Sequence, residues 1–361
     1  MERLRPCGFP LRTPSLGGVL LKSLPLIGVT MGDPAGVGPE IIVMALSDPS
    51  LYKICRPVVL GDPGVLAQTI STLSAPAMDL SINTVSTPAS AGTTPGVIDL
   101  VPLSELKPGS ARPGRPDVEG GRAMVKCIVR AVEMALAGEI DAMVTAPISK
   151  VLMHQAGYRY EGHTQLISHL TGTRDYVMML AGERLRVALV TIHCALKQVP
   201  KILDTHMVYK TISITAEALR RDFGLIDPRL AVAALNPHAG EDGLFGWEER
   251  DIIGPAVQRA ALDGLMVEGP FPADTLFYKA ASGPYDAVVA MYHDQGLIPL
   301  KLLHFSDAVN ITLGLPIIRT SVDHGTAYDI AGTGRADPSS LKEAIRMAVL
   351  MAENRGRGVS P

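Results

Sequence analysis

The sequence has few aromatic residues, few cysteines and little net charge, and each scarcity argues against a class of protein. Phe, Trp and Tyr make up 4% of the 361 residues, a composition that suits a β-sandwich poorly. The formal net charge of −3 provides no basic stripe, so we expect no nucleic-acid partner. The cysteines form no CxxC pair, which argues against a disulfide framework or a thiolate zinc site and fits a reducing compartment; they are Cys7, Cys55, Cys127 and Cys194.

Long uncharged apolar runs are also missing, since no segment reaches the roughly 20 residues that a membrane-spanning helix needs. The amino end contains basic and apolar residues, as a secretory signal does. However, Arg12, Pro14 and Lys22 interrupt it, and its last apolar run leads straight into MGDPAG. We interpret residues 1–24 as a loose amino-terminal extension. We expect a cytoplasmic protein that makes no membrane contact.

What the sequence does contain is an alternation of apolar runs and helical patterns. Residues 24–30, 140–147 and 285–293 are typical of buried strands, and residues 118–138 carry apolar side chains at helical spacing. Hydrophobic residues make up 47% of the chain, with 35 glycines and 28 prolines for tight turns. The alternation predicts an α/β fold with a mostly parallel sheet and helices on both faces. Residues 74–117 show no clear pattern.

Proline-containing joints near residues 145–150 and 296–307 indicate where the chain leaves and re-enters a first domain. We therefore predict two α/β/α domains. Residues 25–150 and 305–361 form the first, and residues 151–304 form the second. A cleft between the two domains is the expected place for the active site.

The stretch from Ala290 to Ala327 organises the candidate chemistry. An apolar strand ends at Ala290, and polar residues including His293 follow it, which is where open α/β sheets bind ligands. Further polar residues come soon afterwards, separated by glycines and prolines that we expect to hold them on loops. This pattern predicts a site for a small anionic ligand, with a metal possible; the further polar residues are Lys301, Asn310, Arg319, Asp323 and His324.

Three histidines each follow an apolar strand: His193, His238 and His293. Imidazoles at the carboxyl ends of neighbouring strands can share one divalent cation and leave positions open for substrate oxygens. Their spacing matches no short metal motif, so each taken alone is more often an ordinary polar loop residue. A histidine-based nucleophilic site is the rival interpretation, although no GxSxG elbow accompanies it. We expect the thiol of Cys194 to be buried, because it alternates with His193 along a continuing strand.

Other residues have both a binding and a structural interpretation. His163 and Thr164 follow a glycine and could donate to a phosphate or hydroxyl, whereas Thr164 could simply cap a helix. Lys301 and Arg319 could supply positive charge to an anion, or could be solvated surface charges. Asp274 could accept a hydrogen bond from substrate or cap a turn. The segment GDPAGVGPE lacks the third glycine of a dinucleotide fingerprint, so it is either an anion-holding turn or an ordinary tight one.

Several motifs together resemble those of the 4-hydroxythreonine-4-phosphate dehydrogenases of vitamin B6 biosynthesis. They are MGDPAGVGPE, GHT, NPHAGE, PADT, AMYHDQG and NITLGLPIIRTSVDHGTA, in this order, and the resemblance runs from about residue 24 to the last helix. The segment HGTAYDIAGTGRADP is similar to the adenosine-binding segment of the isocitrate and isopropylmalate dehydrogenases, which share this fold. The resemblance implies NAD-dependent oxidation, with decarboxylation, of 4-phosphooxy-L-threonine to 3-amino-2-oxopropyl phosphate.

The resemblance also implies the cofactors, the assembly and the role of each site residue. NAD and one divalent metal ion (Zn, Mg or Co) are implied, in a homodimer whose active site both subunits complete. The first domain would carry the cofactor and the second the metal and the dimer contact. The metal ligands would be His193, His238 and His293; the catalytic residues Lys301 and Asp274; the substrate contacts His163, Thr164, Lys301, Asn310 and Arg319; and the cofactor contacts His324, Gly325, Thr326 and Ala327.

The sequence departs from the family pattern at a few positions. Gln165 stands where the family usually has an acid, and Cys194 and Ala195 stand beside His193 where Ile and Pro are common. TAPISK and NPHAGEDGLFG resemble a branch that oxidises 4-phospho-D-erythronate or phospho-threonate as much as the vitamin branch. That activity is therefore the first alternative. A binding protein for an anionic metabolite, without catalysis, is the second.

Overall fold

The computed structural model describes residues 23–73, 79–107 and 109–356, so most of the predicted extension 1–24 lies outside the described residues. The chain divides into two compact units. The 23–174 unit consists of Ser23–Arg174 together with the chain from Leu315 onward, and the 175–314 unit consists of Asp175–Gly314. These boundaries differ from the predicted 150 and 305. The segment 151–174 stays with the first unit because Leu152, Met153, Leu166 and Ile167 join its core.

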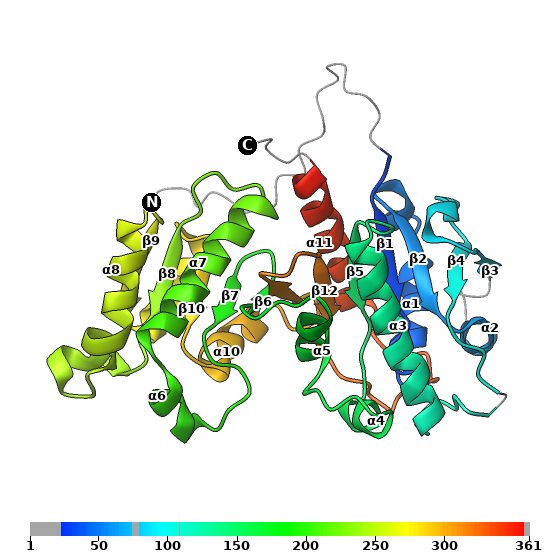
Figure 1. Ribbon diagram of the computed structural model, residues 1–361, viewed down its shortest axis with the longest axis horizontal. Helices are drawn as coiled ribbons and strands as arrows, with labels where there is room; N and C mark the ends of the chain where they lie inside the picture. Colours follow the sequence, from blue (N-terminus) through cyan, green and yellow to red (C-terminus); the bar gives the residue numbers. More distant parts are fainter. Residues whose placement is uncertain (1–22, 74–78, 108, 357–361) are drawn as a thin grey trace, which may run out of the picture. The chain divides into compact units, whose positions relative to one another are not determined.

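The 23–174 unit contains a parallel sheet of six strands with the order β3-β4-β2-β1-β5-β12 (Figure 1). Apolar residues occupy most positions of its central strands because both faces are covered, as is usual in parallel sheets. The strands are β1 (Leu26–Thr30), β2 (Arg56–Gly61), β3 (Ser81–Thr84), β4 (Val97–Pro102), β5 (Ala142–Thr145) and β12 (Arg319–Val322).

The helices of this unit pack on both faces of the sheet and begin at recognisable capping residues. Asp117 caps the long helix α3 by accepting from Gly120 N at 2.7 Å, and Asp62 caps α2 in the same way. Val58 and Leu60 of β2 join the core cluster that α3 covers. The helices are α1 (Gly38–Leu46), α2 (Pro63–Thr72), α3 (Val118–Leu136), α4 (Lys150–Gln155), α5 (His163–Leu170) and α11 (Ser339–Gly356), with short turns η1 (Leu51–Lys53) and η3 (Pro88–Ser90).

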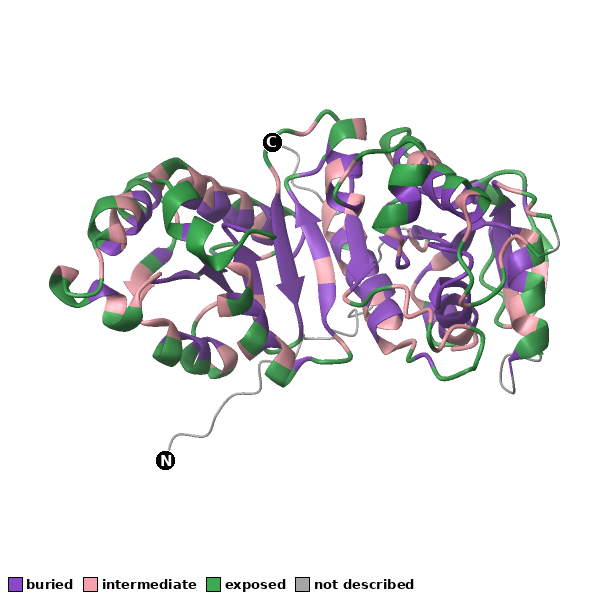
Figure 2. Ribbon diagram, turned by 90° about the horizontal axis from the view of Figure 1, so that it is seen from below, coloured by how far each residue is buried: buried purple, intermediate pink, exposed green. Residues whose placement is uncertain are grey.

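The 175–314 unit contains a mixed sheet with the order β11-β6-β7-β10-β8-β9. Strands β7, β10, β8 and β9 are parallel neighbours, whereas β6 runs antiparallel to both β7 and β11. Figure 2 shows the central strands of this sheet as buried ribbons with exposed helical surface around them, whereas β9 at the edge is mostly partly exposed. The strands are β6 (Val177–Ala181), β7 (Arg186–Leu189), β8 (Leu230–Ala233), β9 (Val267–Phe271), β10 (Ala287–Ala290) and β11 (Val309–Leu313).

Helix α10 of this unit runs from the carboxyl ends of the parallel strands back to their amino ends. It begins at His293, just after β10, and ends near His304, whose Nε2 accepts from Arg184 N at 3.1 Å in the β6–β7 turn. Gly296 permits close packing, because a Cβ there would lie 2.4 Å from Val187. The other helical segments are η4 (Leu196–Gln198), α6 (Val199–Ile202), α7 (Thr205–Arg221), η5 (Pro237–Gly243), η6 (Glu249–Ile253), α8 (Gly254–Leu262), α9 (Ala273–Ser282) and α10 (His293–Leu303).

The predicted fold class, α/β with a mostly parallel sheet and flanking helices, is confirmed. The prediction that loops hold the later polar residues was wrong for three of the five, whereas Asp323 and His324 do lie in a bend after β12. Lys301 lies on α10, Asn310 on β11 and Arg319 on β12. Gly314 and Pro316 separate two short strands rather than extending a loop. Within the described part of the chain, no helix is both long and apolar enough to cross a membrane.

Candidate functional site

Four candidate residues follow four adjacent strands of the 175–314 unit. Strands β7, β10, β8 and β9 are parallel and neighbours in that order, so their carboxyl ends meet at one edge of the sheet. His193 follows β7, His293 follows β10, His238 follows β8 and Asp274 follows β9. This edge is where α/β sheets present ligand-binding groups.

Two of the three histidines lie side by side. The ring centroids of His193 and His293 are 5.6 Å apart, and the Nδ1 atom of His293 lies 2.7 Å from Asp294 Oδ1. A carboxylate on Nδ1 orients the imidazole and leaves Nε2 for a metal. His238 lies on η5, in a backbone stretch with positive φ. Among the residues that the structure describes, no three His, Cys, Asp or Glu side chains lie close enough together to hold an ion.

The donor chemistry of this edge fits a divalent cation, because imidazole nitrogens suit zinc and related metals and the His293–Asp294 contact is typical of a metal-ligating histidine. His193, His293 and His238 are the residues that would hold it, with the first two already adjacent. The expectation that Cys194 is buried was wrong. β7 ends at Leu189, so strand alternation does not extend to the thiol, which is exposed.

We call the edge at the carboxyl ends of β7, β10, β8 and β9 the histidine edge. Lys301 and Asn310 lie away from it. Lys301 is eight residues beyond His293 on α10, which corresponds to about 12 Å along the helix axis. Its Nζ lies 5.9 Å from the centroid of the Phe305 ring. Asn310 pairs with Leu180, which in turn pairs with Val187 in the first half of β7. Both residues are therefore displaced toward the amino ends of β7 and β10, opposite His193, His238 and His293.

The 23–174 unit contains a buried cationic cluster around Arg319 and His163. The Arg319 side chain is 2% exposed and donates to Thr145 Oγ1 from Nη2 at 2.8 Å and from Nε at 3.2 Å. Burial lowers the pKa of Arg319 to about 9. His163 lies close enough to Arg319 for the guanidinium charge to act on its imidazole. The buried Nε2 of His163 has no hydrogen-bond partner among the described residues. A buried polar atom without a partner indicates a place for a ligand atom.

The ends of β1 and β5 add hydroxyl groups to this cationic cluster. Thr145 ends β5 and Thr30 ends the neighbouring β1, where its buried Oγ1 also has no partner among the described residues. Thr164 is 6% exposed and is the second residue of α5. The capping role suggested for Thr164 was wrong, because Gly162 occupies the N-cap position. Together these residues can hold an anionic group with charge-assisted hydrogen bonds.

Replacing His163 with Gln should flatten the pH dependence of stability below about pH 6.5. Burial, reinforced by Arg319, lowers the pKa of His163 well below its ordinary value of 6.5. As the pH falls through 6.5, the unfolded imidazole binds a proton and the folded one does not. The free energy of unfolding therefore decreases by up to about 1.4 kcal/mol per pH unit until the folded-state pKa is reached. Urea unfolding between about pH 7.5 and 5.5 measures this slope; equal slopes in the variant and the unaltered protein would contradict it.

The predicted cofactor segment, residues 324–327, is fixed against α1. Val37 N donates to Thr326 O at 2.9 Å, and a Cβ on Gly36 would lie 2.9 Å from the same oxygen. His324 and Gly325 are exposed, and a Cβ at Gly325 would meet nothing within 4 Å. The segment thus offers an anchored backbone with an accessible face, which fits a bound nucleotide in the position that the sequence resemblance implies.

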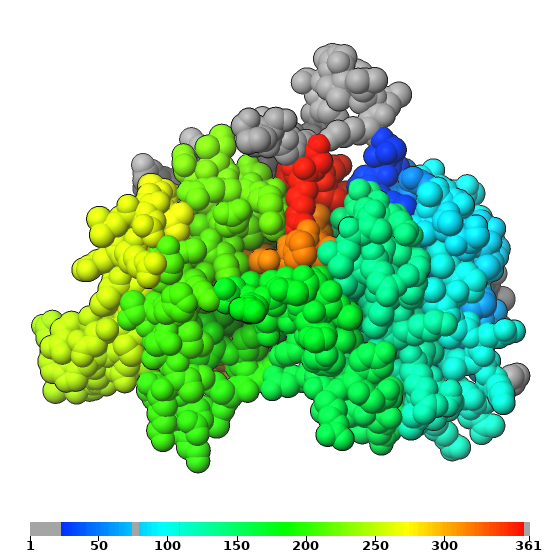
Figure 3. All heavy atoms as spheres, viewed as in Figure 1, coloured from blue at the N-terminus to red at the C-terminus, as the bar shows by residue number. Residues whose placement is uncertain are grey.

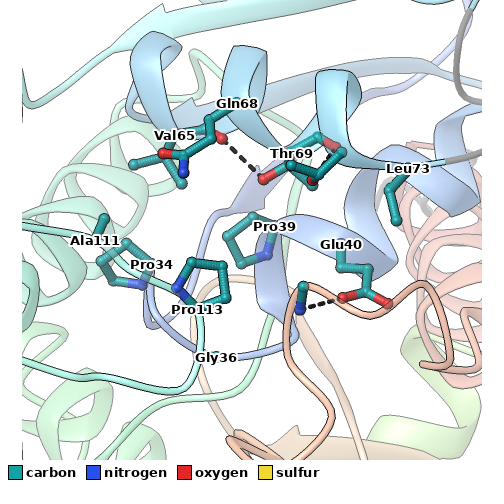
Figure 4. Close-up of a pocket in the computed structure, with 12 residues that line it drawn as sticks. Pro34, Gly36, Pro39, Glu40, Val65, Gln68, Thr69, Leu73, Ala111 and Pro113 are labelled. Carbon is teal, nitrogen blue, oxygen red and sulfur yellow. Dashed lines mark hydrogen bonds between the residues drawn. The ribbon is translucent and has the colours of Figure 1, made fainter. Parts of the chain in front are cut away.

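A neighbouring pocket lies between α1, α2 and the loop that contains Gly332 (Figure 4). Glu40 is 2% exposed and borders it. Its carboxylate accepts from Gly332 N at 2.8 Å and from Ala336 N at 3.3 Å. Gln68 and Thr69 of α2 also line the pocket. No local sequence pattern reveals this anchoring role of Glu40, because it depends on a contact some 290 residues away.

One further buried pair joins the glycine-rich turn to the cofactor segment. Tyr328 donates to Asp33 Oδ2, and Asp33 Oδ1 accepts from Ala35 N at 3.0 Å. Burial raises the pKa of Asp33, and burial together with Asp33 raises the pKa of Tyr328 to about 12. The turn requires glycine at Gly32, where φ is +73° and a Cβ would lie 2.5 Å from Pro147 O. The acidic residue inside GDPAG was the available sequence signal for this pair.

Comparison with known proteins shows one family across most of the chain. The family model described as "Pyridoxal phosphate biosynthetic protein PdxA" matches residues 53–348. A 4-hydroxythreonine-4-phosphate dehydrogenase from Desulforapulum autotrophicum is 54% identical over 332 residues, covering 92% of this chain and 97% of that protein. A D-threonate 4-phosphate dehydrogenase from Pectobacterium atrosepticum is 45% identical over 327 residues, covering 91% of this chain and 99% of that protein.

A solved structure agrees with these relatives. The crystal structure of a 4-hydroxythreonine-4-phosphate dehydrogenase from Klebsiella pneumoniae superposes with a TM-score of 0.84 at 45% sequence identity, covering 91% of this chain and 99% of that one. The resemblance predicted from the sequence motifs is confirmed. The chain belongs to the family of pyridoxal phosphate biosynthetic proteins whose characterised relatives include the 4-hydroxythreonine-4-phosphate dehydrogenases.

Proposed function

We propose that the protein is an NAD-dependent, divalent-metal-assisted dehydrogenase that oxidises and decarboxylates 4-phosphooxy-L-threonine to 3-amino-2-oxopropyl phosphate, in pyridoxal phosphate biosynthesis. The observation that carries the proposal is the 54% identity, over 332 residues, to a relative of that name. The buried Arg319 and His163 support an anionic substrate. The free thiols of Cys55, Cys127 and Cys194 fit the reducing environment of the cytoplasm.

The proposed reaction divides the work among the residues already described. Arg319, His163 and Thr164 bind the anionic part of the substrate, with Lys301 and Asn310 as further contacts. His193, His238 and His293 would hold a divalent ion, whether Zn, Mg or Co, which would supply polarisation of the substrate hydroxyl, and NAD held at residues 324–327 would supply the hydride acceptor. The hydroxyl proton passes to a base, and the bond to the carboxylate then breaks to release CO₂. Lys301 stabilises the resulting negative charge, and Asp274 accepts a hydrogen bond from the substrate.

We further propose a homodimer in which each active site takes residues from both subunits. The support is the separation within the 175–314 unit. The histidines follow the carboxyl ends of β7, β10 and β8, whereas Lys301 and Asn310 lie toward the opposite edge. A single site containing all of them requires a second copy of the chain.

The alternative substrate is 4-phospho-D-erythronate or phospho-threonate. The Pectobacterium relative named for D-threonate 4-phosphate is 45% identical. Gln165 also favours this possibility, because an amide replaces the usual family acid two residues beyond His163, where it bonds to Glu161 at 3.1 Å. The second alternative is an anion-binding protein that performs no catalysis.

An absorbance assay at the NADH band tests the proposal. Purified protein is incubated with NAD, a divalent metal and each phosphorylated acid in turn, with and without a chelator. We expect NADH to form fastest with 4-phosphooxy-L-threonine and to stop when the metal is removed. A higher kcat/KM with the erythronate or threonate phosphate would favour the alternative. No NADH with any of these substrates would favour the binding protein, and turnover that ignores the chelator would refute the metal.

A further inference from the structure

The ends of the four histidine-edge strands are connected by a continuous chain of hydrogen bonds. Thr191 donates to Met291 O from Oγ1 at 2.7 Å and from N at 3.2 Å. Met291 N donates to Gln295 Oε1 at 2.7 Å, and Gln295 Nε2 donates to Ala234 O at 2.6 Å. Ala234 N donates to Phe271 O at 2.8 Å. This chain, which we call the strand-end strap, crosses β7, β10, β8 and β9 in their spatial order.

Every backbone position of the strap, at Thr191, Met291, Ala234 and Phe271, lies two to four residues before a candidate site residue. Thr191 and Met291 are each two residues before a histidine, His193 and His293 respectively. Ala234 is four residues before His238. The two rings that the structure brings within 5.6 Å are those whose strands Thr191 and Met291 connect. The strap thus determines where the loops that carry the imidazoles leave the sheet.

Gln295 is the residue of the strap whose side chain connects the end of β10 to the end of β8. Its amide oxygen accepts from one strand end and its amide nitrogen donates to another, so one neutral side chain connects the two. It is the third residue of α10, where a side chain can reach back to the backbone before the helix. Gly296, the next residue, permits the close approach of α10 to β7 that brings the amide within reach.

The β8 arm of the strap is fixed from a second side. Glu249 is 7% exposed, and its Oε1 accepts from Leu235 N at 2.8 Å and from Asn236 N at 2.7 Å. The peptide groups directly after Ala234 are therefore held by Glu249, while Ala234 O is held by Gln295. Only Pro237 separates this fixed segment from His238, so the starting point of that loop is determined by two side chains.

We infer that Gln295 and Thr191 are positioning residues that set the spacing of the metal-binding histidines. This inference rests on the proposed function, since it concerns the divalent-metal site. Neither residue needs to touch the ion. They reduce the freedom of the loops, so that the imidazoles are already close before a metal arrives, and the metal then does not have to order them.

The test measures metal affinity directly rather than turnover. Zn²⁺ alone is titrated into metal-free protein in competition with a chromogenic chelator, and Co²⁺ absorption reports the coordination geometry. Gln295→Met keeps length and neutrality but removes both hydrogen bonds. We expect it to weaken Zn²⁺ binding by about 10- to 100-fold, the usual effect of losing a group that orients metal ligands. The visible Co²⁺ spectrum should change as well.

Matched variants separate positioning from general damage. Thr191→Val removes the hydroxyl with little change in shape and should also weaken Zn²⁺, whereas Thr191→Ser keeps the hydroxyl and should restore affinity. Gln258→Met alters an exposed glutamine on α8 of the same unit and should leave affinity unchanged. The thermal midpoint of each metal-free variant shows whether the fold persists. If Gln295→Met fails to fold, comparing Thr191→Val with Thr191→Ser still tests whether the strap positions the histidines.

Two outcomes overturn the inference in distinguishable ways. Unaltered affinity and an unaltered Co²⁺ spectrum in both Gln295→Met and Thr191→Val would show that the strap does not position the ligands, while the metal site itself stands. If the unsubstituted protein binds no Zn²⁺, the metal site and this inference fail together.

Discussion

Replacing His293 with Ala should reduce kcat/KM by about a thousandfold or more while leaving the fold intact. The reaction needs a polarised hydroxyl, and losing metal-assisted polarisation removes several kcal/mol of transition-state stabilisation; about 4 kcal/mol corresponds to a thousandfold. The His293 side chain is 37% exposed and lies outside the packed core, so its removal leaves no buried cavity. Steady-state kinetics with saturating metal, together with a thermal midpoint, measure both parts.

An exposed histidine of the same unit provides the control. His206 is exposed on α7 and belongs to none of the three strand-end loops that carry the candidate histidines, so His206→Ala should retain nearly full activity. His238→Ala should behave like His293→Ala. Near-normal rates in His238→Ala would remove it from the ligand set, and near-normal rates in His293→Ala would remove the histidine edge from the mechanism.

Replacing Arg319 with Met should raise KM for the phosphorylated substrate by at least about a hundredfold. A desolvated guanidinium that loses contact with an anion forfeits about 2 to 5 kcal/mol, and each 1.4 kcal/mol is tenfold in affinity. The side chain is 2% exposed, so water cannot replace the lost interaction easily. The thermal midpoint without ligand should not fall, because burying the charge is costly and Met fills a similar volume.

Two further variants sharpen the Arg319 experiment. Arg319→Lys keeps the charge but loses the planar pair of donors that reaches Thr145, so its KM should lie between the two extremes. Arg159→Met changes an exposed arginine of the same unit and should have little effect. If the KM of Arg319→Met for the substrate is unaltered, the anion is held elsewhere and the cationic cluster around His163 has another role.

The histidine edge could be predicted from the sequence because its signal is local. Apolar runs end directly before His193, His238 and His293, and parallel strands place such residues at a common edge. The order β7-β10-β8 was not available from any local pattern, since it depends on which strands pair. The structure supplied that order, and with it the adjacency of His193 and His293.

The contacts that the sequence did not reveal connect residues far apart in the chain. Gln295 bonds to Ala234, 61 positions away, and Arg319 bonds to Thr145, 174 positions away. No composition or periodicity encodes such pairs. β11 and β12 were assigned to loops because they are only five and four residues long and are separated by Gly314 and Pro316. Their stability comes from pairing with β6 and β5, which a single-sequence pattern does not report.

The strand-end strap also divides the 175–314 unit into a fixed base and an outer rim. The residues that follow it are exposed, including Leu196 after β7 and Leu244, Phe245 and Trp247 after β8. The segment between β8 and α8 (yellow-green) forms the lobe at the left edge of Figure 3. Substitutions on this rim can reshape what surrounds a bound substrate without moving the base. Relatives named for different phosphorylated acids can therefore have the same strand-end strap and differ in the exposed residues that follow it.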